Sequence, residues 1–166
     1  MIWDFNKLIV IQKELDKKIF KKFHTQYKST SSKRKLALIV ELCELANEIR
    51  FFKFWSTKSS SELKIILDEL ADVFHFAFTF AIQYKSSNVY NIPNIKKDKK
   101  NINSKLTIYF SSLIKLAQNI KDKKTIDLFI KQLIKLSIIL GFNKKQIFEA
   151  YLLKNEINLQ RNKSNY

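Results

Sequence analysis

The chain has 166 residues, 46% of them hydrophobic, and carries 31 lysines and arginines against 15 acidic residues, a formal charge of +16 at pH 7. This length supports one domain with a hydrophobic core, while one glycine and one proline exclude folds with many tight turns, such as β-sandwiches, β-barrels and collagen-like chains. The single cysteine, Cys43, excludes an internal disulfide and suits a reducing compartment, so we expect a cytoplasmic protein.

Apolar residues recur at three- and four-residue steps in long windows, which predicts an all-α domain built as a bundle of five to six helices. The first three helices are expected at about residues 4–23, 33–49 and 59–84. The second follows the run Ser29-Thr30-Ser31-Ser32, which can supply its N-cap. The third begins where Ser59 and Glu62 have the spacing of a capping box.

Residues 86–104 interrupt the helical pattern. They contain Pro93, five asparagines and the run Lys96-Lys97-Asp98-Lys99-Lys100, and we predict a solvated, flexible loop that is either a functional flap or a disordered insertion. Three more helices are expected at about 105–120, 123–140 and 143–158, with Gly141 as a C-cap residue and Asn143 and Gln146 as a capping box. Residues 159–166 would form a C-terminal tail, so that one domain spans 1–166.

Negative charge gathers in one part of this positive chain. Seven of the 15 acids lie between Glu41 and Asp72 beside only four bases, so this window carries −3 and the other 134 residues carry +19. Glu41 and Glu44 are three residues apart, as are Glu69 and Asp72, which places each pair on one helix face. Facing pairs repel unless a cation lies between them, and Mg²⁺ prefers oxygen ligands. The alternative is a solvated helix face, although the intervening apolar residues indicate largely buried helices.

Four segments resemble one enzyme family. The stretch from Glu41 to Ser56, which contains ExxE and FKFWS, and the stretch Glu69-Leu-Ala-Asp72-Val-Phe-His75-Phe76 resemble the ExxE…ExxD signature of the MazG-like all-α nucleoside triphosphate pyrophosphatases. More narrowly they are similar to the dimeric dUTP diphosphatases, whose N-terminal and closing motifs resemble residues 12–16 and 151–166. The resemblance implies a homodimer of all-α bundles that hydrolyses dUTP, and also dUDP, to dUMP.

The resemblance also implies roles for individual residues. Two or more Mg²⁺ ions per site, with Mn²⁺ as a substitute, would be held by Glu41, Glu44, Glu69 and Asp72. Catalytic roles fall to Glu41, as the general base, and to Glu44. Phosphate contacts carry over to Lys154 and Arg161, with Lys58 and Lys53 as weaker candidates. The base and sugar would be contacted by Asn158, Trp55, His75, Phe76, Gln12, Asp16 and Tyr166, although His75 and Phe76 could instead be core residues.

Two other functions stay open at this point. A MazG-like pyrophosphatase for another nucleotide would share the carboxylates but not the base pocket. A basic helical nucleic-acid-binding protein without catalysis is suggested by the charge of +16 alone. Because a compositional bias also explains that charge and no recognition-helix motif accompanies it, we expect no nucleic-acid partner. We also expect no membrane span, since the longest apolar run, Val73–Ile82, is about half of the roughly 20 residues required.

Overall fold

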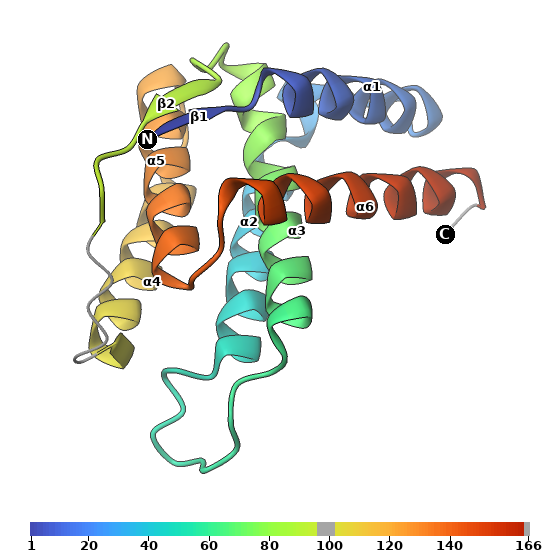
Figure 1. The fold of residues 1–166 in the computed structure, drawn as a ribbon. Coiled ribbons are helices and arrows are strands. Elements are labelled where there is room, and N and C mark those ends of the chain that lie inside the picture. The colour runs from blue at the N-terminus through green and yellow to red at the C-terminus, as the bar shows by residue number, and fades with distance from the viewer. Residues whose placement is uncertain (96–101, 165–166) are drawn as a thin grey trace.

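Figure 1 shows the chain as a computed structural model, which describes residues 1–95 and 102–164. Within this part of the chain the predicted all-α fold of five to six helices is confirmed. The helices are α1 (Asn6–Lys22), α2 (Tyr27–Ile49), α3 (Leu63–Gln83), α4 (Ile102–Gln118), α5 (Lys123–Ile139) and α6 (Lys144–Lys163). Two short strands, β1 (Ile2–Asp4) and β2 (Val89–Asn91), form an antiparallel ribbon beside them.

The helix α3 lies at the centre of the bundle and contacts α1, α2, α5 and α6. Its side chains are buried on nearly every side between Val73 and Ala81, as is typical of a helix surrounded by other helices. In Figure 1, α2 runs alongside α3, α4 and α5 lie on one side of this pair, and α1 and α6 cross it. In the described part of the chain, neither α3 nor any other helix combines the length and apolar character needed to span a membrane.

The β-ribbon corrects the prediction at two places. The sequence predicts a helix from residue 4 and a solvated loop across 86–104, but β1 pairs with β2 with Trp3 opposite Tyr90, and both side chains are buried. Asp127 on α5 holds this segment in place by accepting a hydrogen bond from the Tyr90 hydroxyl at 2.9 Å. A strand of three residues is too short for its alternating pattern to be recognised in a sequence.

Two helix starts also differ from the prediction. The helix α2 begins at Tyr27 rather than at residue 33, because the Gln26 N–H donates to Ser29 Oγ at 3.2 Å and the Ser/Thr run continues the helix instead of preceding it. At the start of α3, Glu62 is itself the N-cap and makes no side-chain cap hydrogen bond, so the capping box expected from Ser59 does not form.

The last residues of the predicted loop and the first residues of the predicted tail are helical. The helix α4 begins at Ile102, and the lysine run 96–100 lies outside the described residues. The helix α6 continues to Lys163, so the first part of the expected tail 159–166 extends the last helix. Tyr166 lies outside the described residues.

The junction between α5 and α6 forms as predicted. Gly141 follows the C-cap residue with φ = +96°, and its N–H donates to the Ile138 carbonyl at 3.0 Å. Asn143 and Gln146 form the reciprocal capping box, with N–H to side-chain oxygen distances of 2.9 and 3.0 Å.

Replacing Gly141 tests this junction. Gly141→Ala should lower the free energy of unfolding by about 1–2 kcal/mol, because a Cβ is disfavoured at positive φ. The surrounding space is open, so the cost comes from the backbone and not from a clash. Urea denaturation measures it, with Ser112→Ala at an exposed position of α4 as the control. An unchanged unfolding midpoint for Gly141→Ala would contradict the strain argument.

Candidate functional site

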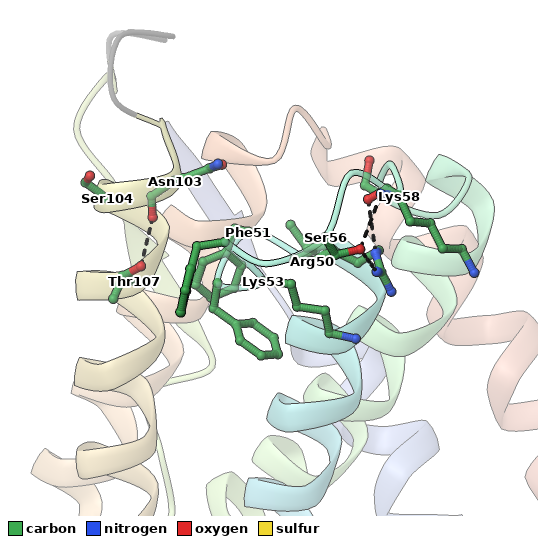
Figure 2. A pocket seen from close by; sticks show the side chains of 12 residues that line it. Arg50, Phe51, Lys53, Ser56, Lys58, Asn103, Ser104 and Thr107 are labelled. Atoms are coloured by element: carbon green, nitrogen blue, oxygen red, sulfur yellow. Dashed lines mark hydrogen bonds between the residues drawn. The ribbon is translucent and has the colours of Figure 1, made fainter.

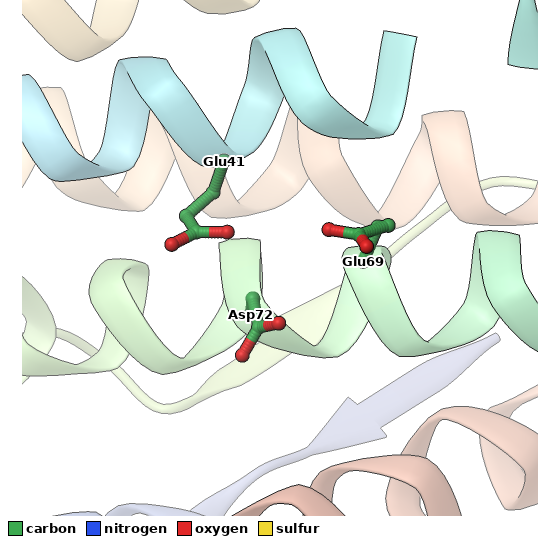
Figure 3. A group of neighbouring side chains, drawn as sticks. All are labelled: Glu41, Glu69 and Asp72. Carbon is green, nitrogen blue, oxygen red and sulfur yellow. The ribbon is translucent and has the colours of Figure 1, made fainter. Parts of the chain in front are cut away.

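Three carboxylates from neighbouring helices converge at one point, which we call the acidic centre. Glu41 on α2 and Glu69 and Asp72 on α3 each contribute an oxygen, and these atoms lie within 4.8 Å of one another. Figure 3 shows Glu41 extending from α2 toward α3, the helix that carries the other two side chains. All three side chains are half-buried, because the neighbouring apolar residues anchor both helices in the core: Leu38, Leu42, Leu70 and Val73.

Burial and repulsion raise the pKa of each carboxyl group in the acidic centre. The pKa of Glu41 rises to about 7, first through burial and then through the charges of Asp72, Glu44 and Glu69. The pKa values of Glu69 and Asp72 are also raised, with burial as the largest cause. Carboxylates held together in this way disfavour their own ionisation, and a cation among them restores it.

Lys154 brings one positive charge to the acidic centre from α6. Its Nζ donates to Asp72 Oδ2 at 2.5 Å and to Asp68 Oδ2 at 2.7 Å. Burial opposes the charge of the ammonium group, but these two hydrogen bonds outweigh burial and raise the Lys154 pKa. Asp68 is a site residue that the sequence pattern did not predict. Its position next to Glu69 did not indicate that it lies at the same site, because adjacent residues of a helix point in different directions.

Glu44 and Arg161 lie at the edge of this arrangement. Glu44 is exposed one helical turn after Glu41 and is outside the group of three converging carboxylates, although its charge contributes to the raised pKa of Glu41. Arg161 is exposed on α6, and its charge is among the influences that lower the pKa of Asp72 against the larger effect of burial. Both residues are therefore close enough to act electrostatically on the acidic centre.

A buried chain of polar side chains links α1 to α3 and α6. Gln12 Nε2 donates to Asp16 Oδ1 at 2.7 Å, and Gln12 Oε1 contacts His75 Nδ1 at 2.8 Å and accepts from the Tyr151 hydroxyl. The Tyr27 hydroxyl donates to Asp16 Oδ2 at 2.7 Å. Gln12 and Asp16, which the resemblance suggested as base or sugar contacts, are only 2% and 4% exposed. The fold thus places them behind the surface, where their polar groups bind one another.

The other base-pocket candidates on α3 and α6 have mixed positions. Phe76 is half-buried and packs against the core, and Asn158 is half-buried on α6. Asn155, one turn before Asn158, is only 7% exposed, and its Oδ1 has no hydrogen-bond partner among the described residues. The sequence did not predict a role for Asn155, because neither its spacing nor its residue type distinguishes it from other asparagines of this chain.

Trp55, Lys53 and Lys58 lie on the connection between α2 and α3, which projects from one end of the bundle in Figure 1. Trp55 is 65% exposed and contacts Phe54. The two lysines line a cavity of about 700 Å³ together with Arg50 and with residues at the start of α4, as Figure 2 shows. Among the described residues, this lining includes no member of the acidic centre.

A comparison with known protein families gives one match, and it extends over nearly the whole chain. A family model described as dUTPase matches residues 4–166, essentially the full sequence, and so covers the acidic centre, α1 and α6 together. No curated protein matches the chain significantly.

The raised pKa of Glu41 predicts how stability depends on pH when divalent cations are removed. Its pKa is about 7 in the folded protein against an ordinary value of 4.5, so the folded state binds more protons between these values. The free energy of unfolding should therefore fall as the pH rises from about 4.5 to about 7. In EDTA, the thermal midpoint should be lower at about pH 8 than at about pH 6.

Glu41→Gln removes this titration and should reduce the pH dependence of the thermal midpoint. Glu149→Gln, at an exposed position of α6, is the matched control and should keep the wild-type dependence. An undiminished slope in Glu41→Gln would show that Glu41 does not titrate in this range.

Proposed function

The chain belongs to the all-α dUTPase family, and on this premise we propose that it hydrolyses dUTP, and also dUDP, to dUMP in a magnesium-dependent reaction at the acidic centre. Membership makes the protein a dUTP diphosphatase and a hydrolase of nucleotide metabolism. The observation that carries the proposed mechanism is the convergence of Glu41, Glu69 and Asp72. The released product would be pyrophosphate from dUTP or phosphate from dUDP.

The donor set of the acidic centre fits Mg²⁺. Its three side chains offer hard oxygen ligands within 4.8 Å of one another, and their pKa values are raised by burial first and by mutual repulsion second, both of which a bound cation would offset. Glu41, Glu69 and Asp72 would hold one ion, and Glu44, one turn along α2, would help to hold a second. Mn²⁺ shares the preference for oxygen ligands and could substitute. When bound, Mg²⁺ neutralises the phosphate chain and makes its phosphorus more electrophilic.

Glu41 is suited to remove the proton from the attacking water. A carboxylate bound to a cation is a weak base, so Mg²⁺ held beside Glu41 would have to assist by lowering the pKa of the water. The water oxygen forms a bond to a phosphorus of the chain while the bridging P–O bond breaks, and the water proton passes to the Glu41 carboxylate.

Lys154 and Arg161 would bind the phosphates. Lys154 places a buried ammonium group beside Asp72, and Arg161 follows two helical turns later on the same helix. An ammonium group serves as a point charge, whereas a guanidinium can bind two phosphate oxygens at once. The base and sugar would lie along α3 and α6 beyond these cations, near His75, Phe76 and Asn158.

We also propose that the protein is a homodimer. Phe54 is 94% exposed and Trp55 is 65% exposed, a degree of aromatic exposure that is unfavourable in water and typical of a surface covered by a partner. Because Trp55, Lys53 and Lys58 lie on this projecting connection, we infer that they serve the base and phosphates only in a site that a second subunit completes.

The metal-centre mechanism predicts the effect of one substitution. Asp72→Asn removes a charge from the acidic centre and should lower kcat/KM for dUTP by about 100-fold or more, because charge compensation of the phosphates is lost. Product release is measured with saturating Mg²⁺ over a panel of dUTP, dUDP, dCTP and dTTP. The control is Glu149→Gln, which removes one negative charge at an exposed position far in sequence from the acidic centre and should leave kcat/KM unchanged.

The panel also separates the remaining alternatives. Equal wild-type rates on dUTP, dCTP and dTTP would indicate a MazG-like pyrophosphatase without a uracil pocket. Full activity of Asp72→Asn would exclude the proposed metal centre. No turnover, together with nucleic-acid binding that weakens steeply with salt, would favour the nucleic-acid-binding alternative.

The dimer is tested by mass and by one exposed aromatic side chain. Light scattering should give twice the 19.7 kDa of one chain. Phe54→Ala should weaken the dimer, because it removes a large apolar contact, whereas Phe23→Ala at the end of α1, where the ring is 55% exposed, should not. A monomer mass with full activity would contradict the proposed assembly.

A further inference from the structure

The Asp16 carboxylate fixes the orientation of the Gln12 side-chain amide. Both Asp16 oxygens accept hydrogen bonds, Oδ2 from the Tyr27 hydroxyl at 2.7 Å and Oδ1 from Gln12 Nε2 at 2.7 Å. Burial raises the Asp16 pKa, but the hydrogen bonds from Tyr27 and Gln12 and the charge of Arg34 oppose this rise and favour the ionised form. An ionised carboxylate accepts but cannot donate, so the NH₂ end of the Gln12 amide faces Asp16. Its carbonyl end, Oε1, then faces the Tyr151 hydroxyl and His75 Nδ1.

This orientation determines where His75 carries its proton. Gln12 Oε1 can only accept, and it lies 2.8 Å from His75 Nδ1, so Nδ1 must be the protonated nitrogen. Burial, opposed by the Tyr151 carbonyl, lowers the His75 pKa to about 4, which leaves the ring neutral near pH 7. His75 Nε2 is then an unprotonated acceptor, and it is buried without a hydrogen-bond partner among the described residues.

The unpartnered nitrogen lies along the same helix pair as the acidic centre. His75 follows Asp72 by three residues on α3, and Tyr151, whose ring stacks on His75 with centroids 4.0 Å apart, precedes Lys154 by three residues on α6. Three residues correspond to about 4.5 Å along a helix axis. A nucleotide with its phosphates at Asp72 and Lys154 therefore has its sugar and base within reach of His75.

We propose that Asp16 and Gln12 are positioning residues that hold His75 as the Nδ1–H tautomer, so that its Nε2 accepts a hydrogen bond from a donor group of the bound deoxynucleotide. The donor is the N3–H of uracil or a sugar hydroxyl. Cytosine differs because its N3 is an acceptor and would be opposed by the Nε2 lone pair. The substrate part of this inference rests on the proposed function, whereas the tautomer is a property of the free protein.

The first experiment is ¹⁵N NMR of the imidazole nitrogens in the full-length free protein. The chain has two histidines, and exposed His24 serves as the internal reference. We expect His75 to show a protonated Nδ1 and an unprotonated Nε2 that do not titrate between about pH 5.5 and 8. A proton on Nε2 overturns the proposal whatever the enzymatic activity is.

The second experiment identifies the donor by adding dUMP or dCMP and following the ¹⁵N shift of His75 Nε2. A shift with dUMP alone supports the N3–H of uracil, and a shift with both nucleotides supports a sugar hydroxyl. An unshifted Nε2, while the ³¹P signal reports bound dUMP, overturns the acceptor role. If dUMP does not bind and dUTP is not turned over, the proposed function and the acceptor role fail, while the tautomer result still stands.

Two substitutions at the Asp16 end of the chain separate positioning from simple packing. Asp16→Asn offers an amide that can donate or accept, so the Gln12 amide gains a second orientation and His75 should become a mixture of tautomers. We expect kcat/KM for dUTP to fall about tenfold or more, as is typical when an orienting partner is lost. Tyr27→Phe removes the other hydrogen bond to Asp16 but keeps its carboxylate, so the Nδ1–H tautomer should persist.

A folded Asp16→Asn protein with a pure Nδ1–H tautomer and wild-type kcat/KM would overturn the positioning role. If either variant fails to fold, the measurement on the wild-type protein still decides which nitrogen carries the proton.

Discussion

Repulsion between carboxylates is the constraint on which the organisation of this molecule depends. Glu41, Glu69 and Asp72 lie within 4.8 Å of one another because apolar side chains fix α2 against α3, although the charges themselves oppose the approach. Lys154 offsets part of this repulsion, and its Nζ reaches Asp72 and Asp68 only because α6 crosses α3 at this height. The hydrophobic core therefore maintains an arrangement of charge that a flexible chain would avoid, and that arrangement is the one that suits a cation and a phosphate chain.

The contact between α3 and α6 gives the site two successive levels. At the first level Asp72 and Lys154 carry opposite charges, and one turn away His75 and Tyr151 stack as neutral rings. Burial acts differently at the two levels: it raises the pKa of the carboxyl groups and lowers the pKa of His75 to about 4. A nucleotide needs this same order, with charged groups for its phosphates and neutral hydrogen-bonding groups for its sugar and base.

The positions of the charged residues along the chain say more about the site than the net charge does. The chain carries +16, yet the carboxylates of the acidic centre belong to a window of −3, and the family match spans both. The positive excess can raise the local concentration of a polyphosphate by long-range attraction. Phe54 and Trp55 on the projecting connection are exposed and do not pack into the core of the single chain. Burying these rings would require a partner surface.

The sequence by itself determined the helices and the placement of Glu69 and Asp72 on one helix face, because both follow from the helical repeat, which fixes the direction of side chains three and four residues apart. It missed the β-ribbon, since three residues show too little alternation, and it placed the start of α2 six residues late, since a Ser/Thr run can cap a helix or continue it. Only the tertiary structure decided that Glu41 joins the pair Glu69 and Asp72 whereas Glu44 does not, that Lys154 pairs with Asp68, and that Asp16 and Gln12 bind one another beside His75. It also decided that Trp55 lies exposed on the connection between α2 and α3. Such contacts join residues separated by tens of positions, and they depend on how whole helices cross, which no local spacing specifies.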